Sequence, residues 1–148
     1  MATIAKTFHF AASHMLTNLR AGHKCMNMHG HNYEVEVRLM GPVETETGMV
    51  FDYGDLKDVE EWINTHLDHS HISCTKEESE IIQSCCLRIL KSRKDDSSEY
   101  TSKTYVLNKP ATAENIATEI YLQAKRLCSL VSSVMVRETR DTWAVNLD

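Results

Sequence analysis

The chain has 148 residues, of which 42% are hydrophobic and 25% charged, and this composition is typical of one soluble globular domain rather than a disordered or fibrous chain. Its 21 acidic and 16 basic residues give a formal net charge of −5, which argues against general affinity for nucleic acid or an anionic membrane. No apolar run approaches the roughly 18 residues of a membrane span. The first residues lack the apolar core of a signal peptide, so we expect a cytoplasmic protein.

The first half of the chain predicts two strands and a helix. Apolar residues alternate with polar ones over residues 3–12, and the cleanest alternation lies at residues 32–40; both patterns indicate half-buried strands. Asp52 and Asp55 offer N-cap oxygens to a helix that we expect from about residue 55 to residue 66, because its apolar residues form one stripe.

The second half predicts two helices and three short strands. In chain order they are a helix at 81–90, a strand at 104–107, a helix at 112–127, and strands at 133–138 and 143–147. Pro110 ends the first of these strands, Thr112 is a favourable N-cap, and the polar run from Lys91 to Ser98 predicts a loop. This order predicts an α+β domain with helices on one side of an antiparallel sheet.

Three histidines are expected to meet at one end of the first two strands. The apolar face of the first strand continues to His14, while His29 and His31 precede Tyr33 on the apolar parity of the second. Residues i and i+2 of a strand lie about 6–7 Å apart on one face, so two ring nitrogens can reach one metal. Three nitrogens with an open fourth position describe a catalytic zinc, but Cys25 is also a candidate fourth ligand. The alternative is that all three are structural or solvated histidines.

Glu138 is the second feature that indicates a site. It follows Val134 and Val136 on the apolar parity of its strand. A buried carboxylate costs several kcal/mol unless it is paired, so we expect a donor-rich ligand or a basic partner there. The alternative is a strand end at which the carboxylate reaches solvent.

Six motifs in order resemble those of one enzyme family. They are FHFAASH (8–14), GHKCMNMHGHNYEVEV (22–37), GMVFDYGDLK (48–57), LDH (67–69), TAEN (112–115) and VMVRET (134–139). Together they resemble the 6-pyruvoyltetrahydropterin and 6-carboxytetrahydropterin synthases. The resemblance implies a T-fold, in which an antiparallel sheet carries two helices, three subunits close a barrel and two trimers stack as a homohexamer. It treats residues 1–148 as one domain with an insertion around 70–109 that contains an extra helix.

The resemblance also implies roles for individual residues. It makes His14, His29 and His31 the zinc ligands. It makes Cys25 a catalytic acid/base, which Asp68 and His69 complete as a proton-transfer triad shared between neighbouring subunits. An acid/base role for Cys25 is chemically coherent, because a nearby cation lowers a thiol pKa.

The resemblance implies further residues that bind the substrate. By the resemblance, Glu138 anchors the pterin ring, while Thr112 is a weaker candidate because Ala113 stands where relatives often have a second hydroxyl. Three basic residues ahead of the metal motif, Arg20, His23 and Lys24, either hold the triphosphate or belong to a solvated loop. His71 matches no role in the family.

The spacing of Cys25 and His29, CxxxHGH, is similar to that of the 6-carboxytetrahydropterin synthases of queuosine biosynthesis. These convert 7,8-dihydroneopterin triphosphate to 6-carboxytetrahydropterin, acetaldehyde and triphosphate. The alternative is elimination of triphosphate to 6-pyruvoyltetrahydropterin, on the route to tetrahydrobiopterin. A non-catalytic zinc module is a third hypothesis, but such a module needs neither Cys25, Asp68, His69 nor Glu138.

Overall fold

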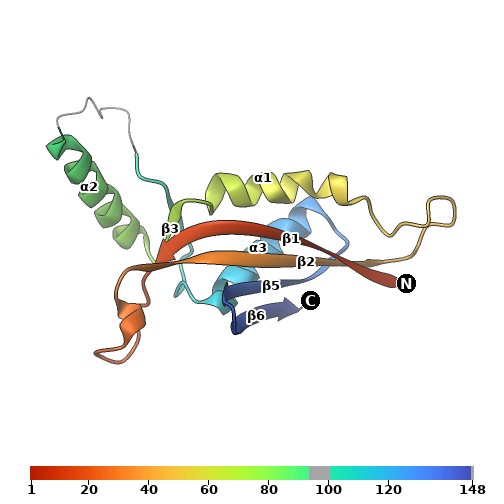
Figure 1. Ribbon diagram of the computed structural model, residues 1–148, viewed down its shortest axis with the longest axis horizontal. Coiled ribbons are helices and arrows are strands. Elements are labelled where there is room, and N and C mark those ends of the chain that lie inside the picture. Colours follow the sequence, from red (N-terminus) through yellow and green to blue (C-terminus); the bar gives the residue numbers. More distant parts are fainter. Residues whose placement is uncertain (94–100, 148) are drawn as a thin grey trace.

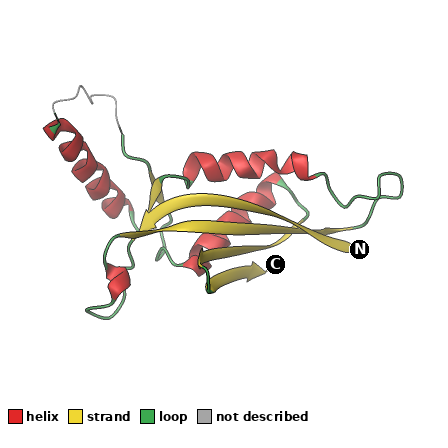
Figure 2. Cartoon of the chain, in the orientation of Figure 1, coloured by secondary structure: helices red, strands yellow, loops and turns green. Residues whose placement is uncertain are grey.

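The computed structural model describes residues 1–93 and 101–147. In this part of the chain, one curled sheet runs the length of the molecule and carries the helices (Figures 1 and 2). Its strands are β1 (Ala2–His14), β2 (His29–Gly41), β3 (Ser70–Ser73), β4 (Thr104–Val106), β5 (Val131–Thr139) and β6 (Thr142–Leu147). They are ordered β4-β3-β1-β2-β5-β6.

The described helices are α1 (Lys57–His66), α2 (Lys76–Ser92) and α3 (Ala113–Leu127), with short 3₁₀ turns η1 (Lys24–Met26) and η2 (Tyr53–Leu56). All three helices were expected, and Thr112 caps α3 by accepting the Asn115 N–H at 3.5 Å. None of them combines the length and the apolar character needed to span a bilayer.

Two helix starts differ from the sequence prediction, and N-caps explain both. The carboxylate of Asp52 accepts the Gly54 N–H at 2.7 Å, so it caps η2, and α1 begins only at Lys57. The hydroxyl of Thr75 accepts the Glu78 N–H at 3.2 Å, so α2 begins five residues before the apolar pattern at residue 81. Lys91 and Ser92, the first residues of the loop predicted at 91–98, belong to α2 instead, and the predicted loop lies outside the described residues from residue 94 onward.

The core is built on the long antiparallel pair of β1 and β2. Phe8 lies opposite Val35 and Phe10 opposite Tyr33, and the rings of Phe10 and Tyr33 stack with centroids 4.7 Å apart. Apolar residues of α1 and α3 join these strands in one buried cluster. The two helices therefore cover one face of the sheet, as the amphipathic patterns predict.

The sheet is mixed rather than wholly antiparallel. The pairs β1–β2, β2–β5 and β5–β6 are antiparallel, as expected, but β3 runs parallel to β1, and β4 runs parallel to β3. The sequence pattern misses β3 because all four of its residues are buried, which removes the period-two alternation that marks a half-exposed strand.

Helix α2 stands apart from this core. It projects from the end of the sheet where β3 lies beside β1 (Figure 1), and Ser79 is its only buried residue among the described ones. Ile81 and Ile89 are 62% and 61% exposed. The apolar pattern of residues 81–90 does form a helix, but that helix does not pack into the core.

This contrast predicts different costs for the same truncation in two helices. Ile63 of α1 is fully buried, whereas Ile81 of α2 is 62% exposed. Ile63→Ala should lower the free energy of unfolding by about 2–5 kcal/mol through lost burial and an unfilled cavity, and Ile81→Ala should change it by less than about 0.5 kcal/mol. Urea unfolding of the two variants measures both, and equal losses would contradict the packing described here.

Candidate metal centre and active site

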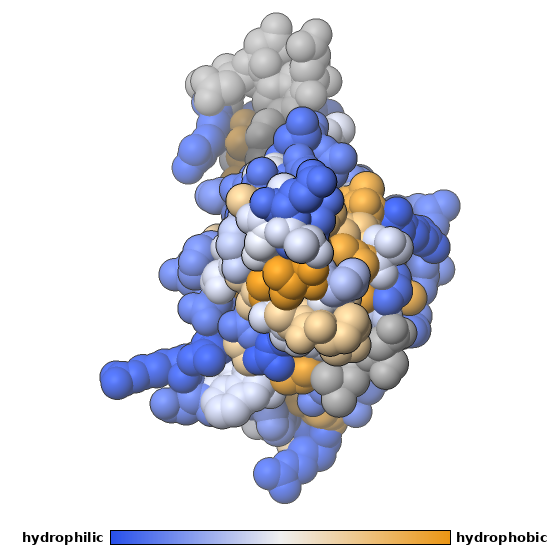
Figure 3. All heavy atoms as spheres, turned by 90° about the vertical axis from the view of Figure 1, so that its right-hand side faces the viewer, coloured by the Kyte–Doolittle hydropathy of each residue, from blue (hydrophilic) through white to orange (hydrophobic). Residues whose placement is uncertain are grey.

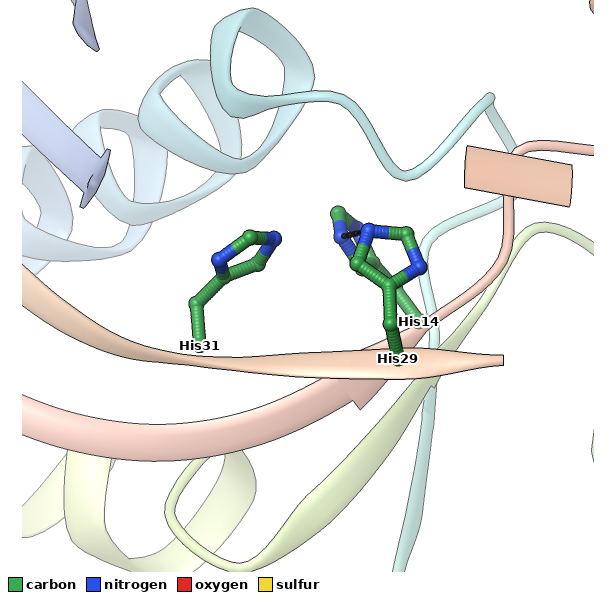
Figure 4. Close-up of side chains that lie close together, drawn as sticks. All are labelled: His14, His29 and His31. Carbon is green, nitrogen blue, oxygen red and sulfur yellow. Dashed lines mark hydrogen bonds between the residues drawn. The ribbon is translucent and has the colours of Figure 1, made fainter. Parts of the chain in front are cut away.

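The structure brings His14, His29 and His31 together at one end of the β1–β2 pair. His14 lies directly opposite His29 in the strand register, and His31 follows on the same face two residues along β2. One ring nitrogen of each lies within 4.8 Å of the others. Figure 4 shows the three rings gathered on one side of the strands, beneath the segment that enters α3.

Backbone carbonyls orient two of these rings. His14 Nδ1 donates to the Ala111 carbonyl at 2.6 Å, and His29 Nδ1 donates to the Asn27 carbonyl at 2.8 Å. A carbonyl oxygen only accepts, so Nδ1 carries the proton and Nε2 keeps its lone pair. The two Nε2 atoms are 3.1 Å apart. Two lone pairs facing each other repel unless a cation or a proton lies between them, so this donor set fits a metal ion.

Burial favours the neutral form of His14 and His31. It lowers the pKa of His14 from 6.5 to about 4, against the opposing effect of the hydrogen bond to Ala111, while His29 and His31 lower it further. Burial and the neighbouring His29 also lower the pKa of His31. Because a metal binds the neutral imidazole, the lowered pKa values of His14 and His31 favour metal binding at neutral pH.

Cys25 lies in η1, on the segment that joins β1 to β2. It is half-buried, and its backbone N–H donates to His23 Nδ1 at 3.2 Å. Within the described residues, the group of candidate ligands contains the three histidines and not Cys25. A set of three histidine ligands is typical of catalytic rather than structural zinc sites, which usually have four protein ligands.

Glu138 lies on β5, next to β2, and has no partner for one carboxylate oxygen. Its Oε1 is buried without a hydrogen bond in the described structure. Burial and then the Glu114 carboxylate raise the pKa of Glu138, while His29 opposes that rise. An orphaned buried oxygen is costly and rare in proteins, so this atom indicates a ligand with N–H donors. The alternative of a carboxylate that simply reaches solvent does not account for the buried Oε1.

Asp68 and His69 form a hydrogen-bonded pair just before β3. Asp68 Oδ2 accepts from His69 Nδ1 at 2.7 Å, and Asp68 Oδ1 accepts the Ala11 N–H at 2.9 Å. The bond from Ala11 is the main cause of a lowered pKa for Asp68. The structure thus holds Asp68 as a carboxylate and leaves Nε2 of His69 available.

The described residues show no hydrogen bond between this pair and Cys25. The side chain of His69 is 82% exposed and lines a groove whose walls include Ala11, Ser13 and His31. His69 is therefore accessible from outside its own chain.

His71, which sequence comparison left without a role, holds α2 in place. It is buried, with Nδ1 2.9 Å from Ser13 Oγ and Nε2 3.0 Å from Glu78 Oε1. Glu78 Oε2 also accepts the Cys74 N–H at 2.8 Å. The network ties β1, β3 and α2 together. The sequence signal for it is the spacing T-x-x-E at Thr75 and Glu78, which is typical of a helix start.

Among the remaining candidates, Thr112 and His23 have local structural roles. The hydroxyl of Thr112 caps α3, and its contact with a pterin stays a prediction. Arg20 and Lys24 are exposed on the segment between β1 and β2, while the His23 ring accepts a backbone N–H. Their role toward a triphosphate also stays a prediction.

Comparison with known proteins identifies the family. The family model for 6-pyruvoyl tetrahydropterin synthase matches residues 3–147. The chain belongs to the 6-pyruvoyl tetrahydropterin synthase family. A 6-carboxy-5,6,7,8-tetrahydropterin synthase from Haemophilus influenzae is 33% identical over 146 residues, covering 94% of each chain. A 6-pyruvoyl tetrahydrobiopterin synthase from Drosophila melanogaster is 32% identical over 129 residues, covering 82% of this chain and 60% of that protein.

A solved structure of this family supports the fold. The 6-pyruvoyl tetrahydropterin synthase of Caenorhabditis elegans superposes with a TM-score of 0.68 at 23% identity, covering 99% of this chain and 95% of that chain. The expected α+β T-fold is thereby confirmed.

The geometry predicts metal binding by the three histidines of this family member. His29→Ala or His31→Ala should weaken Zn²⁺ binding by at least about 100-fold, because each variant leaves two ligands. His9→Ala is the matched control, since His9 is an exposed residue of β1 outside the cluster, and it should bind like the parent. Competition with a chromophoric chelator measures these affinities, and parent-like binding by both ligand variants would refute the site.

Proposed function

We propose that this chain is a zinc-dependent synthase that converts 7,8-dihydroneopterin triphosphate and one water to 6-carboxy-5,6,7,8-tetrahydropterin, acetaldehyde and triphosphate, a step of queuosine biosynthesis. One observation carries the proposal. Ring nitrogens of three histidines lie within 4.8 Å of one another, near the carboxyl group of Glu138, which keeps a buried oxygen without a partner among the described residues. The name of the Haemophilus influenzae relative supports this choice of product.

The histidine cluster and Glu138 bind different parts of the substrate. His14, His29 and His31 would hold zinc, which as a Lewis acid makes the side-chain hydroxyls of the substrate more acidic when it is bound. Glu138 accepts hydrogen bonds from a ring N–H and the exocyclic amine of the pterin, which satisfies its orphaned oxygen. Together these groups orient the side chain of the substrate toward the metal.

Cys25, Asp68 and His69 move the protons. Cys25 acts as acid/base at the substrate carbon atoms, and His69 exchanges the proton with Cys25 through Nε2. Asp68 holds His69 by its Nδ1–H, in the observed 2.7 Å hydrogen bond, and stabilises the imidazolium that forms. Because His69 is exposed and no hydrogen bond of the described residues joins it to Cys25, we propose that neighbouring subunits of a homohexamer of two stacked trimers assemble each triad.

A second product remains a specific alternative. The family model is named for 6-pyruvoyl tetrahydropterin synthase, and the relative in Drosophila melanogaster is named for 6-pyruvoyl tetrahydrobiopterin synthesis. Elimination of triphosphate alone would give 6-pyruvoyltetrahydropterin and no acetaldehyde. Both reactions start from the same substrate and would use the same binding residues, so product analysis has to separate them.

Product analysis tests the proposal. The zinc-loaded protein is incubated with 7,8-dihydroneopterin triphosphate, the pterin is identified by mass spectrometry, and acetaldehyde is measured with alcohol dehydrogenase and NADH. We expect equal amounts of 6-carboxytetrahydropterin and acetaldehyde. A 6-pyruvoyl product without acetaldehyde would contradict the assigned product, and unchanged substrate would favour a non-catalytic zinc module.

Two substitutions separate catalysis from binding. Cys25→Ala should keep its zinc and bind the pterin, while turnover falls by about 10²–10⁴-fold, as expected for loss of an acid/base group. Glu138→Gln should weaken pterin binding at unchanged zinc content, because an amide offers one acceptor where the carboxylate offers two. Metal analysis, pterin titration and initial rates check both variants. Loss of zinc from Cys25→Ala would instead make Cys25 a ligand.

A mixing experiment tests the shared triad. Cys25→Ala and His69→Ala should each be inactive alone, but their refolded mixture should regain part of the activity, because some interfaces pair the two intact residues. A mixture that shows full subunit exchange by mass spectrometry and no recovered turnover would show that each triad lies within one chain.

A further inference from the structure

The peptide group that joins Asp68 to His69 is hydrogen-bonded at both ends. Its carbonyl, that of Asp68, accepts from Lys103 Nζ at 2.6 Å. Its N–H, that of His69, donates to the Ala11 carbonyl at 2.6 Å. Because a peptide group is planar, bonds to both its C=O and its N–H restrict the two backbone dihedrals beside it, ψ of Asp68 and φ of His69. The position of the His69 side chain therefore depends on Lys103 as well as on β1.

His69 has an unusual backbone conformation. Its φ is +56°, in the left-handed region that residues other than glycine rarely adopt. Such a conformation persists only where the surrounding structure holds it, and residues of this kind are concentrated at functional sites. The two bonds to the Asp68–His69 peptide group supply that restraint. Loss of either bond would let the backbone relax and would move the imidazole ring.

Lys103 is itself held at this position by several parts of the fold. It directly precedes β4, and its own carbonyl accepts the His71 N–H of β3 at 3.0 Å. Its side chain also donates to the Asn64 carbonyl of α1 at 2.7 Å. An ammonium group has three N–H donors, and two of them are thus used on backbone carbonyls. Lys103 therefore joins α1 to the Asp68–His69 pair.

The charge of Lys103 supports the same pair. The hydrogen bond from the Ala11 N–H is the main cause of the lowered pKa of Asp68, and the ammonium group of Lys103 lowers that pKa further. An ionised Asp68 keeps accepting from Nδ1 of His69, in the 2.7 Å bond already described. Lys103 thus favours the hydrogen-bonded pair through its charge as well as through the backbone.

We propose that Lys103 is a positioning residue, which holds the peptide group between Asp68 and His69 and thereby fixes where Nε2 of His69 lies. It acts through His69 and needs no contact with the substrate. Its effect on turnover rests on the proposed function, whereas its hold on the backbone does not. The sequence did not indicate this role, because the bonds run to backbone carbonyls 35 and 39 residues away.

Two substitutions of Lys103 test its effect on turnover. Lys103→Met removes the charge and the donors but keeps an unbranched side chain. We expect kcat to fall by about 10–100-fold, because a displaced His69 is poorly aligned for proton transfer, while KM stays within about twofold and the zinc content is unchanged. Lys103→Arg should retain most of kcat, since a guanidinium group still offers N–H donors to both carbonyls.

Lys125→Met is the matched control. Lys125 Nζ also donates to a backbone carbonyl, that of Val131, at 2.7 Å, so the substitution removes the same charge and the same kind of bond. Val131 lies opposite Leu39, near the end of β2 that is far from His31. That end of the molecule faces the viewer in Figure 3, where hydrophilic and hydrophobic residues both reach the surface. Both kinetic constants of this variant should match those of the parent.

Amide hydrogen exchange tests the hold on the backbone without any pterin. In the zinc-loaded protein, the His69 amide should exchange at least about tenfold faster in Lys103→Met than in the parent, because the peptide group loses one of its two restraints and opens locally more often. It should exchange at the parent rate in Lys103→Arg and Lys125→Met. The amide of Ile120, in the buried part of α3, should be unchanged in all variants, which shows that the global stability is retained. If Lys103→Met does not fold, Lys103→Gln, which also lacks the charge and whose side chain is shorter, replaces it with the same expectations.

Four results would overturn the role of Lys103. They are parent-like exchange of the His69 amide in Lys103→Met, unchanged kcat in that variant, an equal loss of kcat in Lys125→Met, and a raised KM at unchanged kcat, which would place Lys103 at the substrate instead. The failure of the proposed function looks different, since exchange is measured without substrate. A parent protein that leaves dihydroneopterin triphosphate unchanged, with the expected exchange pattern in the variants, would refute the function and retain the hold of Lys103 on the backbone.

Discussion

The register between β1 and β2 is the constraint on which the rest of the structure depends. It places His14 directly opposite His29, and the two-residue period of a strand then puts His31 on the same face. A slip of one residue would turn every side chain of one strand to the other face. The stacked pair of Phe10 and Tyr33, in the same register, makes that slip costly. The packing that buries the core therefore also builds the metal centre.

The start of helix α3 also contributes to the metal centre. The carbonyl of Ala111, just before α3, accepts from His14 and thereby selects the tautomer that leaves Nε2 open. Pro110 and the cap residue Thr112 flank this carbonyl, and the fixed φ of proline and the capping bond restrict its position. The start of α3 thus belongs to the metal centre, although it lies 97 residues from His14 in the sequence.

Local patterns predicted those parts of the fold that local physics determines. The alternation from Tyr33 to Leu39 predicted β2, and the threonine at 112 predicted the start of α3, because strand faces and caps depend on neighbouring residues. The strand β3 was missed, because four buried residues have no alternation and its parallel partner is far away in the chain. The amphipathic pattern of α2 could not show that its apolar side lacks a core to pack on, since a pattern does not specify what covers it.

In the candidate site too, the sequence predicted what local strand geometry determines and missed what tertiary contacts determine. Parity alone predicted that three histidines share one face and that Glu138 points inward, since both follow from the period of a strand. The carbonyl partners of His14 and His29, the orphaned Oε1 of Glu138 and the buried bond from His71 to Glu78 arise from tertiary contacts. Family resemblance related Cys25 to Asp68 and His69, and within the described residues the structure shows the bond between Asp68 and His69 but no hydrogen bond from this pair to Cys25.

The central claim is that three imidazoles, and no thiolate, hold the metal and leave one position open. X-ray absorption at the zinc edge of the loaded protein tests this most directly, because nitrogen or oxygen neighbours lie at about 2.0–2.1 Å and thiolate sulfur lies at about 2.3 Å. The account predicts that the nearest neighbours of the zinc ion are three imidazole nitrogens and one oxygen atom, with no sulfur. A sulfur neighbour at the longer distance would make Cys25 a ligand, close the site and contradict the mechanism.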